Sequence, residues 1–385
     1  MPPEPLGLVI LGGGCAGLSL ATRLAALGDR APRTLVLERR AEYADDRTWC
    51  FWDDGTAPAA RLARRRWTRM ALGGPGQRFT IDCGATPYHM LQALPFYQDA
   101  AGAVRLSRRV SLVQGAEVLD APRREGTHWR IETGAGPIHA AQVIDTRPGP
   151  APAPGGAMLW QSFHGREVEC AHDAFDPALP ELMHFAPPNA QAVHFTYVLP
   201  LSPRRALVEA TVFGAAPLGP GVLAAELDAA IAQRCGPAPV RVVRAEDGIL
   251  PMGPPRRAPD ADPTHIRAGL MAGGARPSTG YAFQRIQRWA GACAAALGAG
   301  RPPLPHPADS RLVNVMDRLL LTVLRARPDA GPGLFLSLFE HADTARIIRF
   351  LSDRGTPADY AAIVAALPKG LFLRQLPGAL LRGLR

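Results

Sequence analysis

Three glycines near the N-terminus have the residue type and spacing needed to hold phosphate groups. Gly12 permits a tight turn, Gly14 lets a pyrophosphate approach the backbone, and Gly17 lets a helix pack closely on a strand. A helix that begins here offers free N–H groups and a partial positive charge. The predicted dinucleotide contacts are Gly12, Gly13, Gly14, Ala16 and Gly17.

The elements around this turn have the order that a dinucleotide site requires. Residues 7–11 are a short apolar run typical of a buried strand, and 16–27 carries apolar residues at helical spacing. Residues 34–37 then form a second apolar strand that ends at Glu38. Glu38 is placed to accept hydrogen bonds from ribose hydroxyls. We therefore predict a βαβ unit that binds FAD rather than NAD, because FAD enzymes of this kind usually begin with the motif.

Two later segments are predicted to extend the same sheet. Residues 142–148 form a short strand with Asp145 near its end. Residues 266–274 lead into the turn 276–281, and a helical pattern follows over 282–296. A strand, a turn and a helix create a second helix N-terminus suited to a flavin, although a plain helix cap would be the better explanation of this segment taken alone.

The middle of the chain changes character. A Pro/Gly-rich linker at 148–156 precedes alternating segments at 194–200 and 206–213, which predict an antiparallel hairpin. Helical patterns then cover the C-terminal region, at 312–325, 341–352, 356–366 and 371–384. The predicted fold class is α/β. Its domains are a Rossmann-type FAD-binding part at 1–149 and 265–304, an inserted antiparallel sheet at 150–264, and a helical region at 305–385.

Composition excludes several classes of protein. The 385 residues are 47% hydrophobic, which rules out a disordered chain, and no apolar run is long enough to span a membrane. The net charge of +9 is almost wholly arginine and matches no nucleic-acid motif. Six scattered cysteines support neither a zinc site nor a redox motif, so we expect a reduced, cytoplasmic environment. The last helical segment, with Arg374, Arg382 and Arg385, is predicted either to lie on a membrane surface or to pack on the domain.

Several spaced segments together resemble the FAD-dependent lycopene cyclases, in their bacterial β-cyclase form. The resemblance runs from about residue 7 to 355, and its specificity comes from the order and spacing of the motifs. The segments that carry it are Gly12–Gly17 with Glu38, Arg47–Trp52, Val143–Arg147, Thr196–Pro203 with Val208–Thr211, Asp247–Met252 and Arg276–Tyr281.

The resemblance implies a reaction and a set of residues. A proton would add to the terminal double bond of lycopene, an internal alkene would close the ring, and a proton would leave, giving β-carotene by way of γ-carotene. Glu209 would be the acid, since Leu207, Val208 and Val212 would desolvate its carboxyl; on an alternating strand it could also face solvent. Glu246, placed before a predicted Asp247-Gly248 turn, is the second candidate acid.

The same resemblance implies reduced FAD as cofactor, NADPH as its reductant, and peripheral contact with a membrane that carries the carotenoid. It adds Asp145, Pro277, Ser278, Thr279 and Gly280 to the predicted flavin contacts.

Two departures and two rival functions accompany this prediction. The family commonly has Met-Asp-Phe-Arg where this chain has Met183-His184-Phe185-Ala186, and often an acid where it has Ala210. The rivals are an FAD/NADPH-dependent oxidoreductase acting on an isoprenoid and a carotenoid-binding flavoprotein without catalysis.

Overall fold

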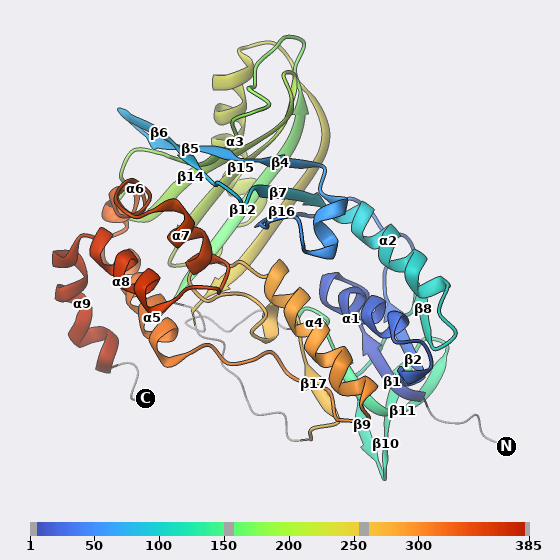
Figure 1. The fold of residues 1–385 in the computed structure, drawn as a ribbon. Helices are drawn as coiled ribbons and strands as arrows, with labels where there is room; N and C mark the ends of the chain where they lie inside the picture. Colours follow the sequence, from blue (N-terminus) through green and yellow to red (C-terminus); the bar gives the residue numbers. More distant parts are fainter. Residues whose placement is uncertain (1–5, 150–157, 254–261, 382–385) are drawn as a thin grey trace.

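The computed structural model describes residues 6–149, 158–253 and 262–381. It contains two large β-sheets and a group of C-terminal helices, as Figure 1 shows. The first sheet lies with the N-terminal helices on the right of the view, and the second rises above it. Most of the predicted linker at 148–156 lies outside the described residues, and so do Arg382 and Arg385.

The first sheet confirms the predicted βαβ unit. Its order is β8-β2-β1-β11-β10-β9, and β17 also pairs with β11. Pairing is parallel among β8, β2, β1, β11 and β17. The strands are β1 (Leu6–Leu11), β2 (Thr34–Glu38), β8 (Val110–Gln114), β9 (Arg123–Glu125), β10 (His128–Thr133), β11 (Gly136–Asp145) and β17 (His265–Arg267).

Helices cover one face of this sheet because its strands are apolar on both sides. Leu20 and Leu24 of α1 (Cys15–Ala26) pack with Trp289 of α4 (Phe283–Gly298) in one buried cluster over β1 and β2. The helix α2 (Ala93–Arg105) lies beside α1. On the other face, Trp129 and Ile131 of β10 pack with the buried residues of β1 and β11. Buried apolar side chains therefore lie on both faces of the parallel strands, as expected for such strands.

The second sheet is the inserted antiparallel one, with the order β16-β12-β15-β14-β13-β5-β6. The predicted hairpin is confirmed as the pair β14–β15. The strands are β5 (Arg69–Gly74), β6 (Gln77–Asp82), β12 (Leu159–Glu169), β13 (Glu181–Phe185), β14 (Ala192–Ser202), β15 (Arg205–Gly214) and β16 (Arg241–Met252). The topology places β5 and β6 in this sheet, although they precede the predicted insertion at 150–264.

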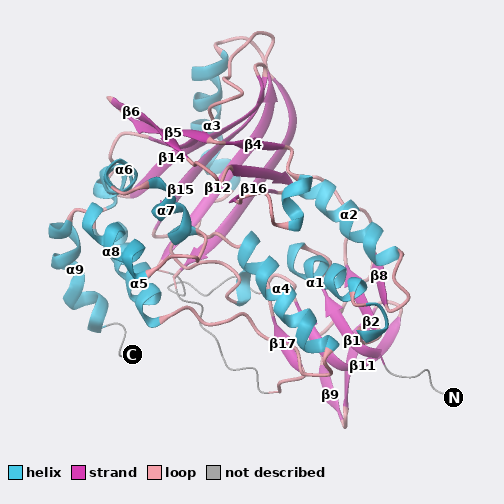
Figure 2. Cartoon of the chain, in the orientation of Figure 1, coloured by secondary structure: helices cyan, strands magenta, loops and turns pink. Residues whose placement is uncertain are grey.

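Each face of the second sheet packs against a different layer (Figure 2). On the face we call outer, Val198, Val208 and Ala210 pack against the helix α3 (Pro220–Cys235). On the inner face, Phe195 and Leu207 join a large core with the C-terminal helices. The small sheet β3-β7-β4 also contributes to that core. Its strands are β3 (Thr48–Trp52), β4 (Arg65–Trp67) and β7 (Tyr88–Gln92).

The C-terminal region is helical, as predicted. It contains α5 (Arg311–Ala326), α6 (Gly331–His341), α7 (Thr344–Leu351), α8 (Pro357–Ala366) and α9 (Lys369–Leu381). The segment predicted over 341–352 begins later than expected, because the Asp343 side chain caps α7 by accepting from the Arg346 N–H. Within the described ranges, no helix is both long and apolar enough to cross a membrane.

One expectation is wrong in detail, and one cysteine pair was not predicted. Asp247-Gly248 is not a turn, because both residues lie inside β16 and pair with β12. Cys170 and Cys235 are joined in a disulfide, with their Cα atoms 6.2 Å apart, although 65 positions separate them in sequence. Packing of α3 on the outer face brings them together, which cysteine spacing alone does not reveal.

Candidate active site

The glycine turn has the shape of a phosphate cradle. Gly12 has a φ of +96°, and a Cβ on Gly17 would overlap the carbonyl oxygen of Gly12, so both positions require glycine. In contrast, a Cβ on Gly14 would meet nothing within 4 Å. Gly14 is also the N-cap of α1, and no side chain caps this helix. Open space beside uncapped N–H groups fits the pyrophosphate of a dinucleotide.

Glu38 lies directly beside this cradle. Its Oε2 accepts a hydrogen bond from the Gly13 N–H at 2.6 Å, and its Oε1 accepts one from the Arg40 Nε at 2.9 Å. Burial acts to raise the pKa of Glu38, but the hydrogen bonds and charge of Arg40 outweigh it and lower the pKa. Glu38 is therefore an ionised acceptor at the end of β2.

The other predicted flavin contacts lie at the same edge of the first sheet or in the loop that follows β17. Asp145 ends β11 opposite Leu11, and its carboxylate binds the Arg147 guanidinium. A Cβ on Gly269 would lie 3.4 Å from the Ala16 Cβ, so the segment after β17 touches the cradle.

The turn that contains Pro277, Ser278, Thr279 and Gly280 joins the two sheets. The Pro277 carbonyl accepts from the Gly253 N–H at the end of β16, and the Gly280 N–H donates to the Arg276 carbonyl. Arg276 is fully buried and binds Asp317 of α5 and the Phe350 carbonyl of α7. The turn therefore leads from the parallel sheet to the inner face of the second sheet.

Both candidate acids lie on that inner face, in one cross-strand row. Tyr197, Glu209, Gly165 and Glu246 are direct partners on β14, β15, β12 and β16. Directly opposed residues of antiparallel strands share a face, so the four side-chain positions point the same way. We call these residues the acid row. Gly165 has no side chain, and a Cβ there would lie 3.3 Å from the Glu209 Cβ and 3.4 Å from its Cγ. The Glu209 side chain therefore leans across Gly165.

Within the described part of the chain Glu209 has no ion-pair partner, although the charge of Arg244 acts to lower its pKa. Its Oε1 accepts a hydrogen bond from the Thr211 hydroxyl, at 2.8 Å. Burial, and then the negative charge of Glu246, raise the pKa of Glu209 to about 8. The cause differs from the sequence expectation, because Val208 and Val212 point to the outer face and only Leu207 shares the inner face. The carboxyl is desolvated by neighbouring strands.

Glu246 is held differently. Its Oε2 accepts hydrogen bonds from the Arg244 Nη1 at 2.6 Å and from the Thr48 hydroxyl at 2.9 Å. Arg244 is itself nearly buried and also binds Glu167 at 2.8 Å and Asp45 at 3.3 Å. Burial raises the pKa of Glu246, and the charge of Arg244 opposes that rise. The two acids therefore differ: one is paired with a guanidinium and the other is not.

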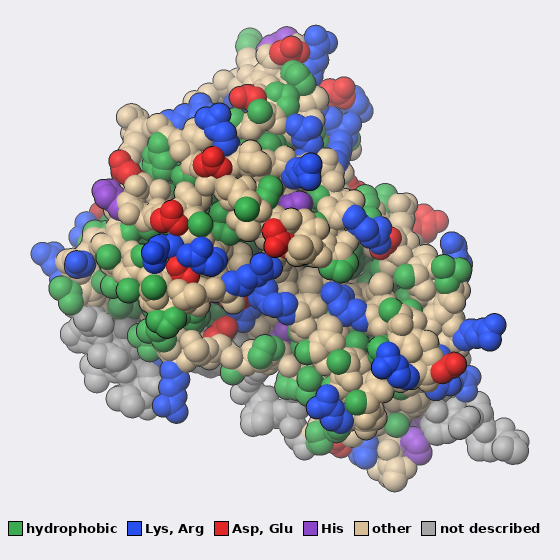
Figure 3. Space-filling model, viewed as in Figure 1, with side chains coloured by type: hydrophobic (Ala, Val, Ile, Leu, Met, Phe, Trp, Pro, Cys, Tyr) green, Lys and Arg blue, Asp and Glu red, His purple; other side chains and the backbone are tan. Residues whose placement is uncertain are grey.

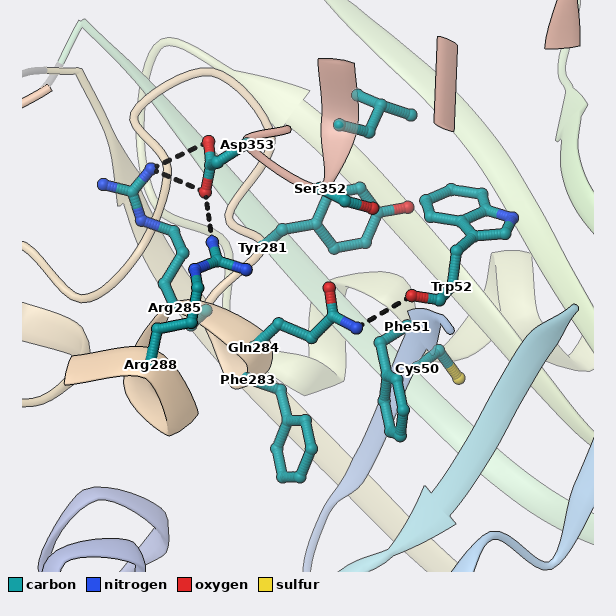
Figure 4. Close-up of a pocket in the computed structure, with 12 residues that line it drawn as sticks. Cys50, Phe51, Trp52, Tyr281, Phe283, Gln284, Arg285, Arg288, Ser352 and Asp353 are labelled. Atoms are coloured by element: carbon teal, nitrogen blue, oxygen red, sulfur yellow. Dashed lines mark hydrogen bonds and ion pairs between the residues drawn. The ribbon is translucent and has the colours of Figure 1, made fainter. Parts of the chain in front are cut away.

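Buried aromatic and thiol groups complete the surroundings. Cys50 interacts electrostatically with both Glu209 and Glu246, and Tyr88 bonds to Cys50. Burial raises the pKa of Tyr88 and of Tyr281 well above the ordinary value, so these phenols are neutral. Figure 4 shows Cys50 and Trp52 of β3 beside Tyr281, which precedes α4, in one pocket. The pocket is lined by β3, by the first turns of α4 and by the residues at the end of α7.

Sequence analysis missed several of these groups as site residues. They are Thr48, Cys50, Tyr88, Gly165, Tyr197, Arg244 and Tyr281. The strand alternation of β14 and β15 would have placed Tyr197 on the same face as Glu209 once the register was known. No sequence signal links Thr48 to Glu246, which are 198 positions apart.

The two departures from the family pattern lie together and away from the acids. His184, Thr196 and Ala210 are cross-strand partners in one row of the second sheet. Ala210 is fully buried on the outer face against α3. An acid at position 210 would therefore not face Glu209.

Comparison with known proteins decides the family. The family model described as "Lycopene cyclase protein" matches residues 7–375. The chain belongs to the lycopene cyclase family. It is 29% identical over 396 residues to a lycopene beta-cyclase of Paracoccus sp., an alignment that covers 94% of this chain and 96% of the relative. This lycopene cyclase family member is therefore expected to be an enzyme that acts on carotenoids.

Solved structures confirm the fold of this cyclase family member. A geranylgeranyl bacteriochlorophyll reductase-like protein of Thermoplasma acidophilum has a TM-score of 0.64 and 13% identity, covering 97% of this chain and 99% of that one. The flavin-dependent monooxygenase PieE, solved with FAD and substrate, has a TM-score of 0.62 and 16% identity. The match covers 95% of this chain and 73% of PieE. Their Rossmann-type fold is that of FAD-dependent proteins.

Proposed function

We propose that this protein is a lycopene β-cyclase in which Glu209 is the proton donor. The observation that carries the proposal is the unequal pair of acids on the inner face. Glu246 has a guanidinium partner and Glu209 has none, so the proton of the pair resides on Glu209 near neutral pH. An acid that keeps its proton at pH 7 is what protonation of an alkene requires.

The reaction balances without an oxidant. The Glu209 proton adds to the terminal carbon–carbon double bond, and the electron pair of an internal double bond closes the six-membered ring. A neighbouring ring carbon then loses a proton, and the product is an isomer of the substrate. The Glu209 carboxylate formed in the first step is a base in position to accept that proton, which would return the pair to its starting state.

The proposed cofactor is FAD, held by the glycine turn, Glu38, Asp145 and the turn from Pro277 to Gly280. These residues fit it, because the space at Gly14 is open and the α1 N-terminus is uncapped. When bound in its reduced, anionic form, FAD would supply negative charge near a cation. We propose NADPH as the source of its electrons.

The decisive experiment is Glu209→Gln, expressed in bacterial cells that accumulate lycopene. Glutamine keeps the size of the side chain and cannot donate the proton, so we expect a folded, flavin-containing protein and unchanged lycopene. Glu226→Gln is the matched control, because Glu226 pairs with His194 on the side of α3. The control should form β-carotene at the normal level.

Product mass separates the rival functions. An isomer of lycopene supports cyclisation, a product of different mass supports a redox enzyme, and lycopene left untouched by the unaltered protein supports a carrier. Ring formation by a folded Glu209→Gln protein would disprove the acid assignment.

A further inference from the structure

Phe163 is an inward-facing aromatic residue with no packing role in the core. It lies on β12, two positions before Gly165, so it shares the inner face with the acid row. Its row partners are Thr211 on β15 and Gly248 on β16. Phe195 and Phe213, on the same face, are fully or nearly buried in the large core, whereas Phe163 is only half-buried and belongs to none of the apolar clusters formed by the described residues.

The ring of Phe163 lies across Gly248. A Cβ on Gly248 would be 2.5 Å from Cζ and 2.6 Å from Cε1 of Phe163. Contacts this short mean that the ring could not keep its position if residue 248 had a side chain. The ring therefore occupies the space that a side chain at position 248 would fill. Gly248 has an ordinary backbone conformation in mid-strand, since it is not among the residues of positive φ. The need for space for this ring therefore explains why residue 248 is glycine. A turn does not explain it, because the residue lies inside a strand.

This position is next to the carboxyls. Thr211, the row partner of Phe163, donates to Glu209, and Gly248 is two positions from Glu246 on the same face of β16. Neighbouring positions on one sheet face lie about 5 to 7 Å apart. An aromatic ring there lies beside the place where a group protonated by Glu209 would stand.

We propose that Phe163 is a catalytic residue that contacts the reacting end of the substrate and stabilises the cation formed when Glu209 protonates it. Gly248 positions the ring. The inference rests on the proposed function, because a cation forms only if Glu209 acts as an acid. A ring face attracts a cation, most strongly where water is excluded. Phe163 and Glu209 are both half-buried on this face of the sheet.

The test compares Phe163→Leu, Phe163→Tyr and Gly248→Ala in the purified, flavin-loaded protein, with lycopene turnover and products measured. Phe163→Leu removes the ring but keeps an apolar side chain, so turnover should fall about tenfold or more. Phe163→Tyr keeps the ring and should retain most activity. Gly248→Ala should lower turnover as well, since it displaces an unaltered ring.

Phe79→Leu is the control, because Phe79 is a half-buried phenylalanine on β6, in the same sheet but far from the acids. It should leave turnover and products unchanged. A structural role for Phe163 predicts that Leu and Tyr variants lose activity together with thermal stability. A role in stabilising the cation predicts that Phe163→Tyr keeps activity that Phe163→Leu loses. It also predicts that Phe163→Leu releases by-products in which the cation has lost a different proton or has added water.

Turnover of Phe163→Leu and Gly248→Ala equal to that of the unaltered protein would overturn the inference, as would equal losses in Phe163→Leu and Phe163→Tyr. Failure of the proposed function gives a different result: either the unaltered protein would form no isomer of lycopene, or Glu209→Gln would still cyclise it. If Phe163→Leu does not fold, the comparison of Gly248→Ala with Phe163→Tyr decides the question.

Discussion

At the scale of single residues, the site depends on the difference between two glutamates in one row. The Glu246 carboxylate accepts hydrogen bonds from Arg244 and Thr48, whereas the Glu209 carboxyl accepts one from the Thr211 hydroxyl. Gly165 between them lets the Glu209 side chain lean toward β16. A proton shared between such neighbours stays on the acid with the fewer donors. The arrangement therefore favours a protonated Glu209 beside a Glu246 that is paired with a guanidinium.

The raised pKa of Glu209 predicts the pH dependence of ring formation. Its pKa of about 8 lies above the value of 4.5 expected for a solvated glutamate. The carboxyl is therefore protonated below pH 8 and loses its proton as pH rises through 8, so the rate should fall above that pH. Initial rates with chemically reduced flavin measure this without involving NADPH. A rate that stays constant to about pH 10 would show that Glu209 does not donate the proton.

The raised pKa of Glu209 also makes the stability of the folded protein depend on pH. A carboxyl whose pKa is raised by folding favours the folded state at low pH, and that contribution is lost between pH 4.5 and 8. Glu209→Gln cannot ionise. We expect the melting temperature of Glu209→Gln to exceed that of the unaltered protein at pH 9, with a smaller difference at pH 5. Thermal unfolding at the two pH values measures the change.

At the scale of elements, Arg244 joins β16 to the small sheet. Its guanidinium bonds to Thr48 of β3 and to the fully buried Glu167 of β12. Removing one partner of a buried ion pair leaves an uncompensated charge and costs about 3 to 5 kcal/mol. Arg244→Met should therefore lower the free energy of unfolding by about that amount.

Arg204→Met is the matched control for Arg244. The pair Arg204–Asp173 is exposed, with 59% and 68% of the side chains accessible, and exposed pairs contribute about 0 to 1 kcal/mol. Chemical denaturation compares the two variants. Equal losses would mean that the Arg244 network does not hold the layers together.

The glycine turn predicts two distinct phenotypes. Gly14→Val places a side chain in open space, so the protein should fold yet lose its flavin, because the new side chain occupies the phosphate position. Gly17→Ala should fail to fold normally, because its Cβ would overlap the Gly12 carbonyl. Flavin absorbance and thermal melting separate these outcomes. Normal flavin content in Gly14→Val would contradict the cradle.

Sequence patterns predict these elements unevenly. The βαβ unit follows from apolar periodicity with glycines at fixed offsets, and the hairpin β14–β15 follows from alternation. Gly248 misleads because a glycine beside Asp247 is typical of a turn, whereas here it makes room for a ring on another strand. Sites such as the Thr48–Glu246 bond depend on a register between distant strands, which local patterns do not encode.

At the scale of the whole molecule, arginines are scattered over the face seen in Figure 3 rather than gathered in one stripe. Figure 3 shows blue and red side chains mixed over the face in view. Many arginines pair with acids, as Arg288 does with Asp353 and Arg346 with Asp359. The net charge of +9 nevertheless favours anionic surfaces.

Exposed apolar residues on the C-terminal helices predict where the protein would contact a membrane. Leu312, Val364 and Leu373, on α5, α8 and α9, are exposed apolar residues. We expect the protein to sediment with anionic phospholipid vesicles and less with neutral ones, and salt at about 0.5 M to weaken the binding by screening. Leu373→Ser should reduce binding, and Val222→Ser on α3 should not. Equal sedimentation with both kinds of vesicle would exclude an electrostatic attachment.

The second sheet also determines the order in which the chain can mature during synthesis. β5 and β6 leave the ribosome early, yet β5 pairs in parallel with β13, which follows more than a hundred residues later. Until β13 has emerged, the Met70 and Leu72 side chains of β5 lack the core in which they are finally buried. The N-terminal segment therefore cannot finish folding before β13 has been synthesised, and completion of this sheet is a long-range step. Cutting the chain near residue 150 would separate strands that belong to one sheet.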